Sequence, residues 1–275
     1  MKKTKVLFVS SEITPYVEAN PLSTIGRYLP QAIQEKGREI RTFMPRYGCI
    51  NERRNQLHEV IRLSGMNIII DDADHPLIIK VASIQSCRMQ VYFIDNEEYF
   101  QRKSLLNDAD GTFFQDNDER SIFFCRGVIE TVRKLGWAPD VIHCNGWMTA
   151  PMALLIKKVF REDPIFAETR VVYTIHDDAF ADSLNKRYAL KINMAGMQDA
   201  DLKRLKEPTF ANVTKFAIDH ADGIIQGSPD LTSDLEKHIK SSQKPFLRYQ
   251  DPEGYAEHYN RFYDQVLEEA PVLAE

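Results

Sequence analysis

The sequence has few cysteines and no apolar segment long enough to cross a membrane. Its four cysteines form no Cys-x-x-Cys pair and lie far apart, at Cys49, Cys87, Cys125 and Cys144. This spacing argues against a zinc site or a disulfide framework, so we expect free thiols in a reducing compartment. The apolar run Val6-Leu7-Phe8-Val9 ends at Ser10, which is too short for a signal peptide or a membrane span. We therefore expect a cytoplasmic protein that does not bind membranes.

Clustered positive charge is also lacking. The formal net charge is −5, and no long run of Lys and Arg occurs in the chain. A protein that binds the phosphate backbone of nucleic acids needs a basic surface. Nucleic acid is therefore not an expected partner.

Three motifs of phosphate binding and nucleophilic catalysis are absent, namely Gly-x-Gly-x-x-Gly, the Walker pattern and Gly-x-Ser-x-Gly. After the first expected strand the chain instead has Glu18-Ala19-Asn20-Pro21, which places an acid and a proline without an amide hydrogen near a helix start. Such a segment suits an anionic ligand poorly, and its simplest interpretation is a plain surface loop. No cofactor is expected.

The chain does contain alternating strand-like and helix-like segments. An apolar run at residues 5–9, helical spacing from residue 22 to Gly37 and a second run at 39–44 predict a βαβ unit. Further expected strands lie at 141–143, 171–175 and 223–226, and expected helices at 116–135, 149–160, 213–220 and 228–240. Strand-like runs at 60–63, 66–70, 77–81 and 89–94 indicate an antiparallel insertion at the sheet edge.

This alternation predicts an α/β fold with a single Rossmann-like, doubly wound, mostly parallel sheet. Asp116 and Glu119 resemble a capping box at one helix start, and Ser228 before Pro229 predicts another helix start. The segment 255–267 carries an apolar stripe, so we expect a C-terminal helix docked on the sheet. We expect one domain at 1–240, with 241–275 as its linker and docking helix.

Side chains capable of chemistry gather where the expected strands end, which is where doubly wound folds bind ligands. His143 and His176 are candidates to bind a sugar hydroxyl or transfer a proton, and a structural role is equally favoured for each. Trp147 and Tyr16 offer rings for carbohydrate stacking, with core packing as the competing interpretation. His143, Cys144 and His176 lack further residues at ligand spacing, so no metal is expected.

Several segments in the same order resemble the amino-terminal domain of bacterial glycogen synthases and plant starch synthases. They lie at residues 5–12, 44–48, 116–124, 139–143, 174–176, 221–222 and 226–229. The resemblance implies half of a two-domain GT-B glycosyltransferase that moves glucose from ADP-glucose or UDP-glucose onto an α-1,4-glucan. In that family the amino-terminal domain mainly contacts the acceptor, and the carboxy-terminal domain binds most of the nucleotide.

The chain departs from the family pattern at the positions nearest the chemistry. The family's Lys-x-Gly-Gly-Leu is here Glu18-Ala19-Asn20-Pro21-Leu22, which reverses the local charge. Its His-x-His-Asp-Trp-His is here His143-Cys144-Asn145-Gly146-Trp147-Met148, whereas Thr-Val-His-Asn becomes Thr174-Ile175-His176-Asp177. About 45 residues follow Ser228, whereas a second Rossmann domain needs on the order of a hundred. We therefore expect the donor-binding half to be missing.

These departures predict a pseudoenzyme that binds a glucan, such as a maltooligosaccharide, or a protein partner. The expected binding residues are Tyr16, His143, Trp147 and His176. The alternative is an active glucosyltransferase, either alone or completed by a second chain, with Asp116, Arg120 and His176 on the acceptor side. A pure interaction module is a third hypothesis, and no residue is assigned a catalytic role on the sequence alone.

Overall fold

One mixed sheet organises the computed structural model, which describes residues 3–269. Its parallel strands are β1 (Lys5–Ser10), β2 (Glu39–Pro45), β6 (Met89–Asp95), β7 (Val141–Asn145), β8 (Arg170–Ile175), β9 (Gly223–Gln226) and β10 (Phe246–Leu247). The strands of its antiparallel edge are β3 (His58–Glu59), β4 (Met66–Ile70) and β5 (Ala73–Ile84). The order is β10-β9-β8-β7-β1-β2-β6-β5-β3, with β4 paired to β5. The expected α/β fold with a mostly parallel sheet is confirmed.

The antiparallel edge exists, but it is smaller than the sequence indicated. β5 pairs antiparallel with β3, β4 and β6, whereas β6 is parallel to β2 and so belongs to the main sheet. The strand expected at residues 60–63 is wrong, because Leu63 N donates to Val60 O at 2.8 Å in a turn. Ile61 in this turn is 82% exposed. An apolar run forms a strand only where a partner strand packs beside it, and that partner is not visible in local sequence.

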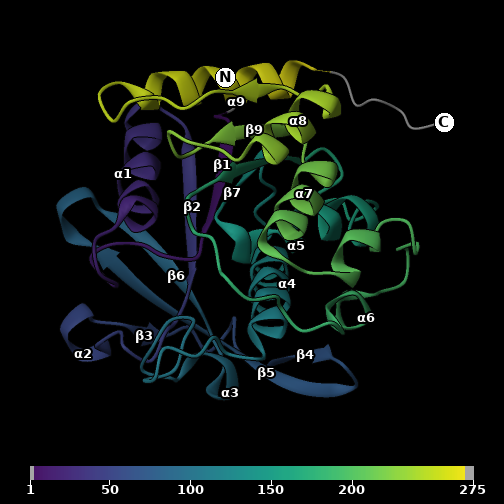
Figure 1. The fold of residues 1–275 in the computed structure, drawn as a ribbon. Helices are drawn as coiled ribbons and strands as arrows, with labels where there is room; N and C mark the ends of the chain where they lie inside the picture. The colour runs from purple at the N-terminus through teal and green to yellow at the C-terminus, as the bar shows by residue number, and fades with distance from the viewer. Residues whose placement is uncertain (1–2, 270–275) are drawn as a thin grey trace.

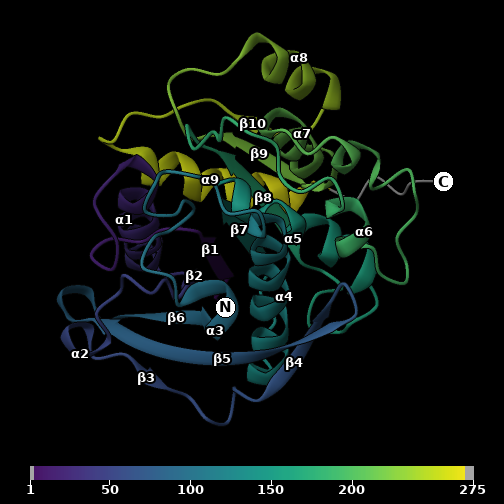
Figure 2. The ribbon, with the colours of Figure 1, turned by 60° about the horizontal axis from the view of Figure 1, so that its bottom comes forward.

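Helices cover both faces of the sheet (Figure 1). α1 (Pro21–Glu35) and α9 (Tyr255–Glu268) pack on one face, and α4 (Asn117–Leu135), α5 (Pro151–Leu154) and α7 (Phe210–His220) pack on the other. Figure 2 shows α8 (Ser233–Ser242) at the end of the molecule farthest from β5. The shorter helices are α2 (Glu52–Asn55), α3 (Glu97–Phe100) and α6 (Tyr188–Ile192).

The helix expected at residues 149–160 is helical but irregular. A 3-10 turn at Trp147–Thr149 leads into α5, which continues as a π-helical turn at Leu155–Val159. Two more 3-10 turns lie at Gln85–Cys87 and Lys203–Lys206. Periodicity therefore predicted the presence of a helix here, but not its changes of hydrogen-bond pattern.

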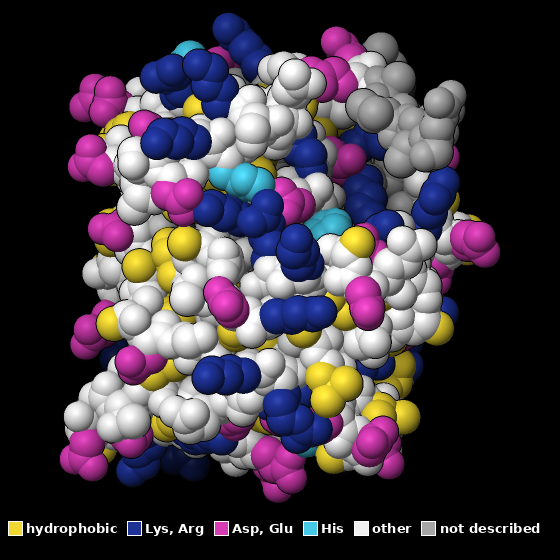
Figure 3. Space-filling model, turned by 45° about the vertical axis from the view of Figure 1, so that its right-hand side comes forward, with side chains coloured by type: hydrophobic (Ala, Val, Ile, Leu, Met, Phe, Trp, Pro, Cys, Tyr) yellow, Lys and Arg dark blue, Asp and Glu magenta, His cyan; other side chains and the backbone are white. Residues whose placement is uncertain are grey.

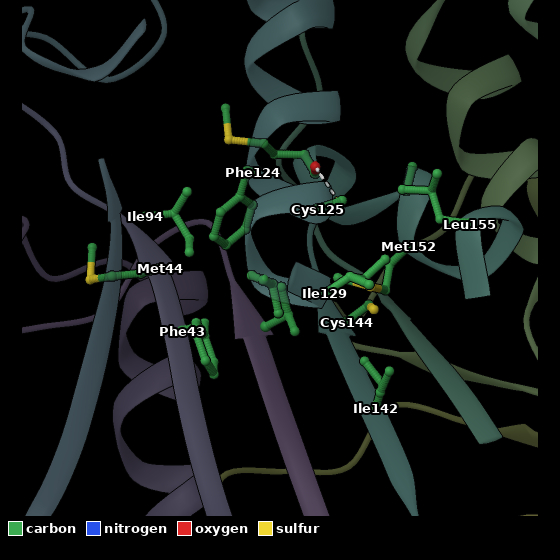
Figure 4. Close-up of a cluster of buried hydrophobic side chains, with 14 of the residues drawn as sticks. Phe43, Met44, Ile94, Phe124, Cys125, Ile129, Ile142, Cys144, Met152 and Leu155 are labelled. Carbon is green, nitrogen blue, oxygen red and sulfur yellow. Dashed lines mark hydrogen bonds between the residues drawn. The ribbon is translucent and has the colours of Figure 1, made fainter. Parts of the chain in front are cut away.

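The larger hydrophobic core fills the space between the sheet and α4 (Figure 4). Phe43 of β2 and Ile142 of β7 face Phe124 and Ile129 of α4, and all four side chains are buried. Cys125 and Cys144 lie in the same core as free thiols, where burial raises the pKa of each thiol. Because residues on both sheet faces are buried, the central strands have continuous apolar runs in the sequence.

Two predicted helix starts are wrong in detail. Asp116 precedes α4 but makes no side-chain capping bond, since Arg102 binds both of its carboxylate oxygens at 2.7 and 2.5 Å. Ser228 does not begin a helix, because its Oγ accepts a hydrogen bond from Asp177 N at 2.7 Å. α8 starts later, where Thr232 accepts from Leu235 N. In both cases a contact distant in sequence uses the side chain that local pattern assigned to a cap.

The C-terminal helix α9 docks on the sheet as its apolar stripe predicted. Tyr259, Phe262, Tyr263 and Val266 are all buried against β-strand residues and α1. The division expected between 1–240 and 241–275 falls inside α8 and stays a prediction. Residues 1–2 and 270–275 of those two segments lie outside the described residues.

The surface mixes charges of both signs. Figure 3 shows Lys and Arg side chains interspersed with Asp and Glu on the face that it draws, with apolar side chains in small separate patches. Among residues 3–269, each helix is either too short or too polar to pass through a bilayer.

Candidate functional site

The carboxyl ends of β1, β7 and β8 meet in register at one edge of the sheet. Ser10 pairs with Asn145, and Asn145 pairs with Thr174. The segments that follow, at residues 11–12, 146–147 and 176–178, therefore lie close together, and we call them the strand-end edge. A Cβ atom on Gly146 would lie 2.6 Å from Asp178 Oδ2 and 3.2 Å from Ser11 Oγ, so all three segments are in contact.

His176 lies at the strand-end edge with half of its hydrogen-bonding capacity unused. Its Nε2 donates to Asn145 Oδ1 at 3.2 Å, whereas its buried Nδ1 has no partner among the described residues. The side chain is only 4% exposed, and burial lowers the pKa of His176 to about 4. Gly227 allows this placement, because a Cβ there would lie 2.7 Å from Nδ1. The imidazole is therefore neutral at physiological pH and has one nitrogen able to accept a hydrogen bond.

His143 is placed differently, inside β7 on the face that α9 covers. Its Nδ1 lies 2.6 Å from Tyr263 Oη, and its Nε2 lies 2.6 Å from Thr174 Oγ1. The side chain is wholly buried, and burial, together with the nearby His176, lowers the pKa of His143 to about 3. Both ring nitrogens are occupied, so His143 contacts no ligand in this conformation. Its predicted role in substrate binding stays a prediction.

Trp147 belongs to the strand-end edge, but its ring is enclosed by other aromatic rings. Phe180 meets it edge-on with ring centroids 5.0 Å apart, and Phe113 lies 6.1 Å away. Trp147 is 2% exposed, whereas Phe180 is only partly buried. Phe180 is therefore the ring of this cluster that reaches solvent, and Trp147 supports it from below.

Tyr16 is not brought together with the other candidates. Its ring packs edge-on against Phe93 of β6 with centroids 4.8 Å apart, and burial raises the pKa of its phenol to about 12. No hydrogen bond or ring contact within residues 3–269 joins Tyr16 to Trp147 or His176. The structure thus separates one expected binding residue from the rest.

Asp116 and Arg120 are both engaged in holding the start of α4. Asp116 is paired with Arg102, as described above. Arg120 is wholly buried and donates to Tyr99 O at 2.8 Å and to Asn117 Oδ1 at 2.5 Å, with Phe100 beneath its guanidinium. Burial lowers the pKa of Arg120 to about 10, so it is still charged at neutral pH. Its Nη2 has no partner among the described residues.

Asp178 is a residue of this edge that the sequence analysis did not single out. Its Oδ2 accepts a hydrogen bond from Trp147 N at 2.8 Å, and its carboxyl group is largely withdrawn from water. Burial and, to a smaller extent, the neighbouring Glu12 and Asp177 carboxylates raise the pKa of Asp178 to about 7, although hydrogen bonds from the amides of Trp147 and of Asp178 itself oppose this shift. Burial also raises the pKa of Glu12, although a hydrogen bond from Asn20 opposes this effect. Two consecutive acids, one residue after the end of a buried strand, were the signal for this group in the sequence.

The start of α1 is closed by the chain's own side chains. Asn20 Oδ1 accepts from Ser23 N at 2.7 Å, and Ser23 Oγ accepts from Asn20 N at 2.9 Å. Pro21 has no amide hydrogen, and Asn20 Nδ2 donates to Glu12 Oε2 at 2.6 Å. Helix starts bind anions through amide hydrogens that are left unpaired. Here Ser23 N is used, Pro21 has no amide hydrogen and a carboxylate lies beside them, so the geometry agrees with a poor fit for an anionic ligand.

Within the described part of the chain, no three His, Cys, Asp or Glu side chains are grouped so as to hold a metal ion. The groups at the strand-end edge that could contact a ligand are therefore its histidine, its carboxyl groups and the nearby aromatic rings.

Comparisons with known proteins place this geometry in a family. The model of the starch synthase catalytic domain matches residues 5–246. The glycogen synthase of Chlorobium limicola is 41% identical over 174 residues, which cover 63% of this chain and 36% of that protein. The glycogen synthase of Chlorobaculum tepidum is 35% identical over 257 residues, which cover 86% of this chain and 50% of that protein. The chain thus spans half or less of the length of these curated relatives.

A solved structure shares the fold. The catalytic domain of starch synthase IV from Arabidopsis thaliana, described as bound to ADP and acarbose, superposes with a TM-score of 0.70 at 20% identity. The match covers 91% of this chain and 52% of that one. Since the family match spans most of the sequence, the chain belongs to the starch synthase catalytic domain family.

Proposed function

We propose that this chain is a glucan-binding member of its family that does not by itself transfer glucose from a nucleotide sugar. The observation that carries the proposal is the closed start of α1, where Asn20 caps the helix and Glu12 lies beside it. A sugar-nucleotide diphosphate needs amide or cationic donors around it. This segment has no Lys or Arg, Pro21 lacks an amide hydrogen, and Ser23 N already donates to Asn20.

The energetic consequence of this arrangement is large. Each preorganised donor that stabilises charge in a transition state contributes about a hundredfold or more in rate. Relative to the family pattern, the segment at Glu18–Leu22 has lost a lysine and two glycines together. The carboxylates of Glu12 and Glu18 moreover oppose the negative charge that develops on a departing diphosphate.

A neutral carbohydrate suits the same edge better than a nucleotide does. The strand-end edge offers hydrogen-bond acceptors at Asp178 and His176 and a partly exposed ring at Phe180. Sugars bind proteins through hydroxyl donors and through the apolar faces of their rings. The related starch synthase IV structure is described with a carbohydrate analogue, acarbose, which is consistent with this ligand class.

Affinity electrophoresis in gels that contain glycogen tests the binding half of the proposal. We expect the purified protein to migrate more slowly in glycogen gels than in plain gels. Migration at an unchanged rate would count against glucan binding and would favour a protein partner instead.

The second candidate is an active glucosyltransferase, and one feature of the site favours it. The neutral His176 keeps an unpartnered nitrogen where the strands end, as a residue that contacts a reacting sugar would. Incubation with ADP-glucose or UDP-glucose and a maltooligosaccharide separates the candidates. We expect no chain elongation, and turnover by the isolated chain would establish the transferase.

A designed variant isolates the role of the loop. The triple substitution Glu18→Lys, Asn20→Gly, Pro21→Gly restores a cation and flexible amide donors at the start of α1. We expect this variant to bind ADP more tightly than the original chain in equilibrium dialysis. Equal binding by both proteins would show that the loop is not the reason for the lost donor site.

A further inference from the structure

Gly146 and Asp178 fit each other so closely that position 146 has no room for a side chain. Gly146 has a φ of +84°, a conformation that side chains rarely adopt. A Cβ atom there would lie only 2.6 Å from Asp178 Oδ2, so the carboxyl group of Asp178 occupies the space that a side chain at 146 would fill. The amide of Trp147 fixes the same oxygen at 2.8 Å. The chain thus holds a carboxyl group from the end of β8 directly over the end of β7.

Asp178 differs from the fully buried acids Asp95 and Asp118 in having no cationic partner among the described residues. Asp118 is fully buried and lies 2.8 Å from Lys191 Nζ, and the fully buried Asp95 lies 2.9 Å from Lys80 Nζ. No Lys or Arg forms an ion pair with Asp178 within residues 3–269. Its second oxygen, Oδ1, accepts no hydrogen bond from any other described residue. Within the described residues its carboxyl group accepts hydrogen bonds from the amides of Trp147 and of Asp178 itself. A carboxyl group placed so tightly without a cation points to a ligand rather than to stability.

The surroundings of Asp178 define the chemistry of that ligand. Glu12 lies on one side and the neutral His176 belongs to the same segment, so neither side chain offers a positive charge to a phosphate or a carboxylate. Phe180, two residues along the chain, presents a partly exposed ring. An unpaired carboxyl oxygen beside an aromatic ring matches a hydroxyl group on a neutral sugar ring.

We propose that Asp178 is the specificity-determining residue of the strand-end edge, where its Oδ1 accepts a hydrogen bond from a glucan hydroxyl. This inference rests on the proposed function and assigns the contact that makes the edge select a neutral carbohydrate. Gly146 serves the contact by leaving room for the carboxyl group, and Trp147 N orients it.

The contact should also make glucan binding depend on pH. The titratable groups that face Asp178 are Glu12 after β1, Asp177 in its own segment and Tyr173 of β8, while the first turn of α1 contributes no acid. Burial raises the pKa of Asp178 to about 7 and raises the pKa of Tyr173 well above its ordinary value, so Asp178 changes charge near neutral pH and Tyr173 does not. A carboxylate accepts a stronger hydrogen bond than a carboxylic acid. Affinity should therefore rise as the pH increases from 6 to 8.

Isothermal titration of the whole chain with maltoheptaose tests the inference. The test variant is Asp178→Asn, which keeps the shape and the acceptor for Trp147 N. The control is Asp182→Asn, which removes an exposed acid from the same connecting segment. At pH 8 we expect the control to bind like the original chain and Asp178→Asn to bind about tenfold more weakly, without a rise in affinity between pH 6 and 8.

The possible outcomes are distinct. If the original chain binds maltoheptaose and Asp178→Asn binds equally well with the same pH profile, the role of Asp178 is overturned while glucan binding stands. If the original chain itself shows no rise in affinity with pH, the inference also fails, and that measurement requires no variant. If the original chain does not bind maltoheptaose at all, the proposed function fails and takes this inference with it.

Discussion

The face of the sheet under α9 and the strand-end edge use the same residue types in opposite ways. Under α9, both nitrogens of His143 are hydrogen bonded, and Arg38 is held by Asn260 and Asp264. At the strand-end edge, Nδ1 of His176 has no described partner and Asp178 has no described cation. Both histidines are buried and neutral, so burial alone does not distinguish them.

The difference lies in whether each buried polar group has its hydrogen bonds satisfied. A satisfied buried group stabilises the fold, and its loss is measured as a change in the free energy of unfolding. An unsatisfied group lowers stability and is retained where it contacts a ligand. We therefore interpret the α9 face as structural and the strand-end edge as functional, although each contains a buried histidine.

The largest effect is expected from Tyr263→Ala, which removes a hydrogen-bonded side chain from the face under α9. Tyr263 is wholly buried, packs against Phe8 and bonds His143. Removing its ring leaves a cavity and an unpaired imidazole nitrogen, so we expect the free energy of unfolding to fall by about 4 kcal/mol in urea denaturation. Arg261→Ala, on the solvent side of the same helix, should change it by less than about 0.5 kcal/mol. Equal effects of the two substitutions would show that α9 is not docked as described.

An intermediate effect is expected at the strand-end edge, where Asp178 should make the free energy of unfolding depend on pH. The pKa of Asp178 is raised from 3.8 to about 7, so the folded chain binds this proton more tightly than the unfolded chain does. The resulting stability is fully present below pH 3.8 and is lost as the pH rises through 7.

The comparison of the original chain with Asp178→Asn isolates this contribution, because the other titrating groups are common to both. Between pH 5 and 7, the original chain should lose on the order of 2 kcal/mol of stability relative to the variant. Urea denaturation at both pH values measures it. A constant difference between the two proteins would mean that Asp178 is an ordinary exposed acid.

The smallest effect is expected at the start of α1. Asn20→Ala removes the acceptor for Ser23 N and the amide that holds Glu12. Loss of an N-cap of this kind costs about 1 kcal/mol, which a shift of the urea midpoint would reveal. Asn55→Ala, which lies in the short and exposed α2, provides a control at a helix whose unfolding costs little. No change for Asn20→Ala would contradict the closed helix start.

Much of the fold was predictable from the sequence, because a parallel strand that is buried on both faces has a continuous run of apolar residues. β1, β2, β8 and β9 were predicted within about two residues of their observed limits. α4 ends at Leu135, directly before Gly136, as the glycine predicted, and Gly136 has the left-handed conformation that ends a helix. The strand predicted at residues 60–63 was wrong because a strand needs a partner strand, which local sequence does not show.

The candidate site was harder to predict, because its contacts join residues far apart in sequence. β7 extends two residues past its predicted end, to Asn145, so His143 lies inside the strand rather than at its end. Local sequence does not show on which face of the sheet a side chain lies. His143 lies on the face that α9 covers. The pair Gly146 and Asp178 is separated by 32 positions, and its complementarity appears only once β7 and β8 are side by side.

The most direct test of the central claim is a calorimetric titration of the purified chain with ADP-glucose, followed by maltoheptaose in the same cell. The account predicts no saturable binding of ADP-glucose at millimolar concentrations and clear binding of the neutral oligosaccharide. Saturable, tight binding of ADP-glucose that free ADP displaces would contradict it, because the start of α1 would then accept the diphosphate that its cap and carboxylates are held to exclude.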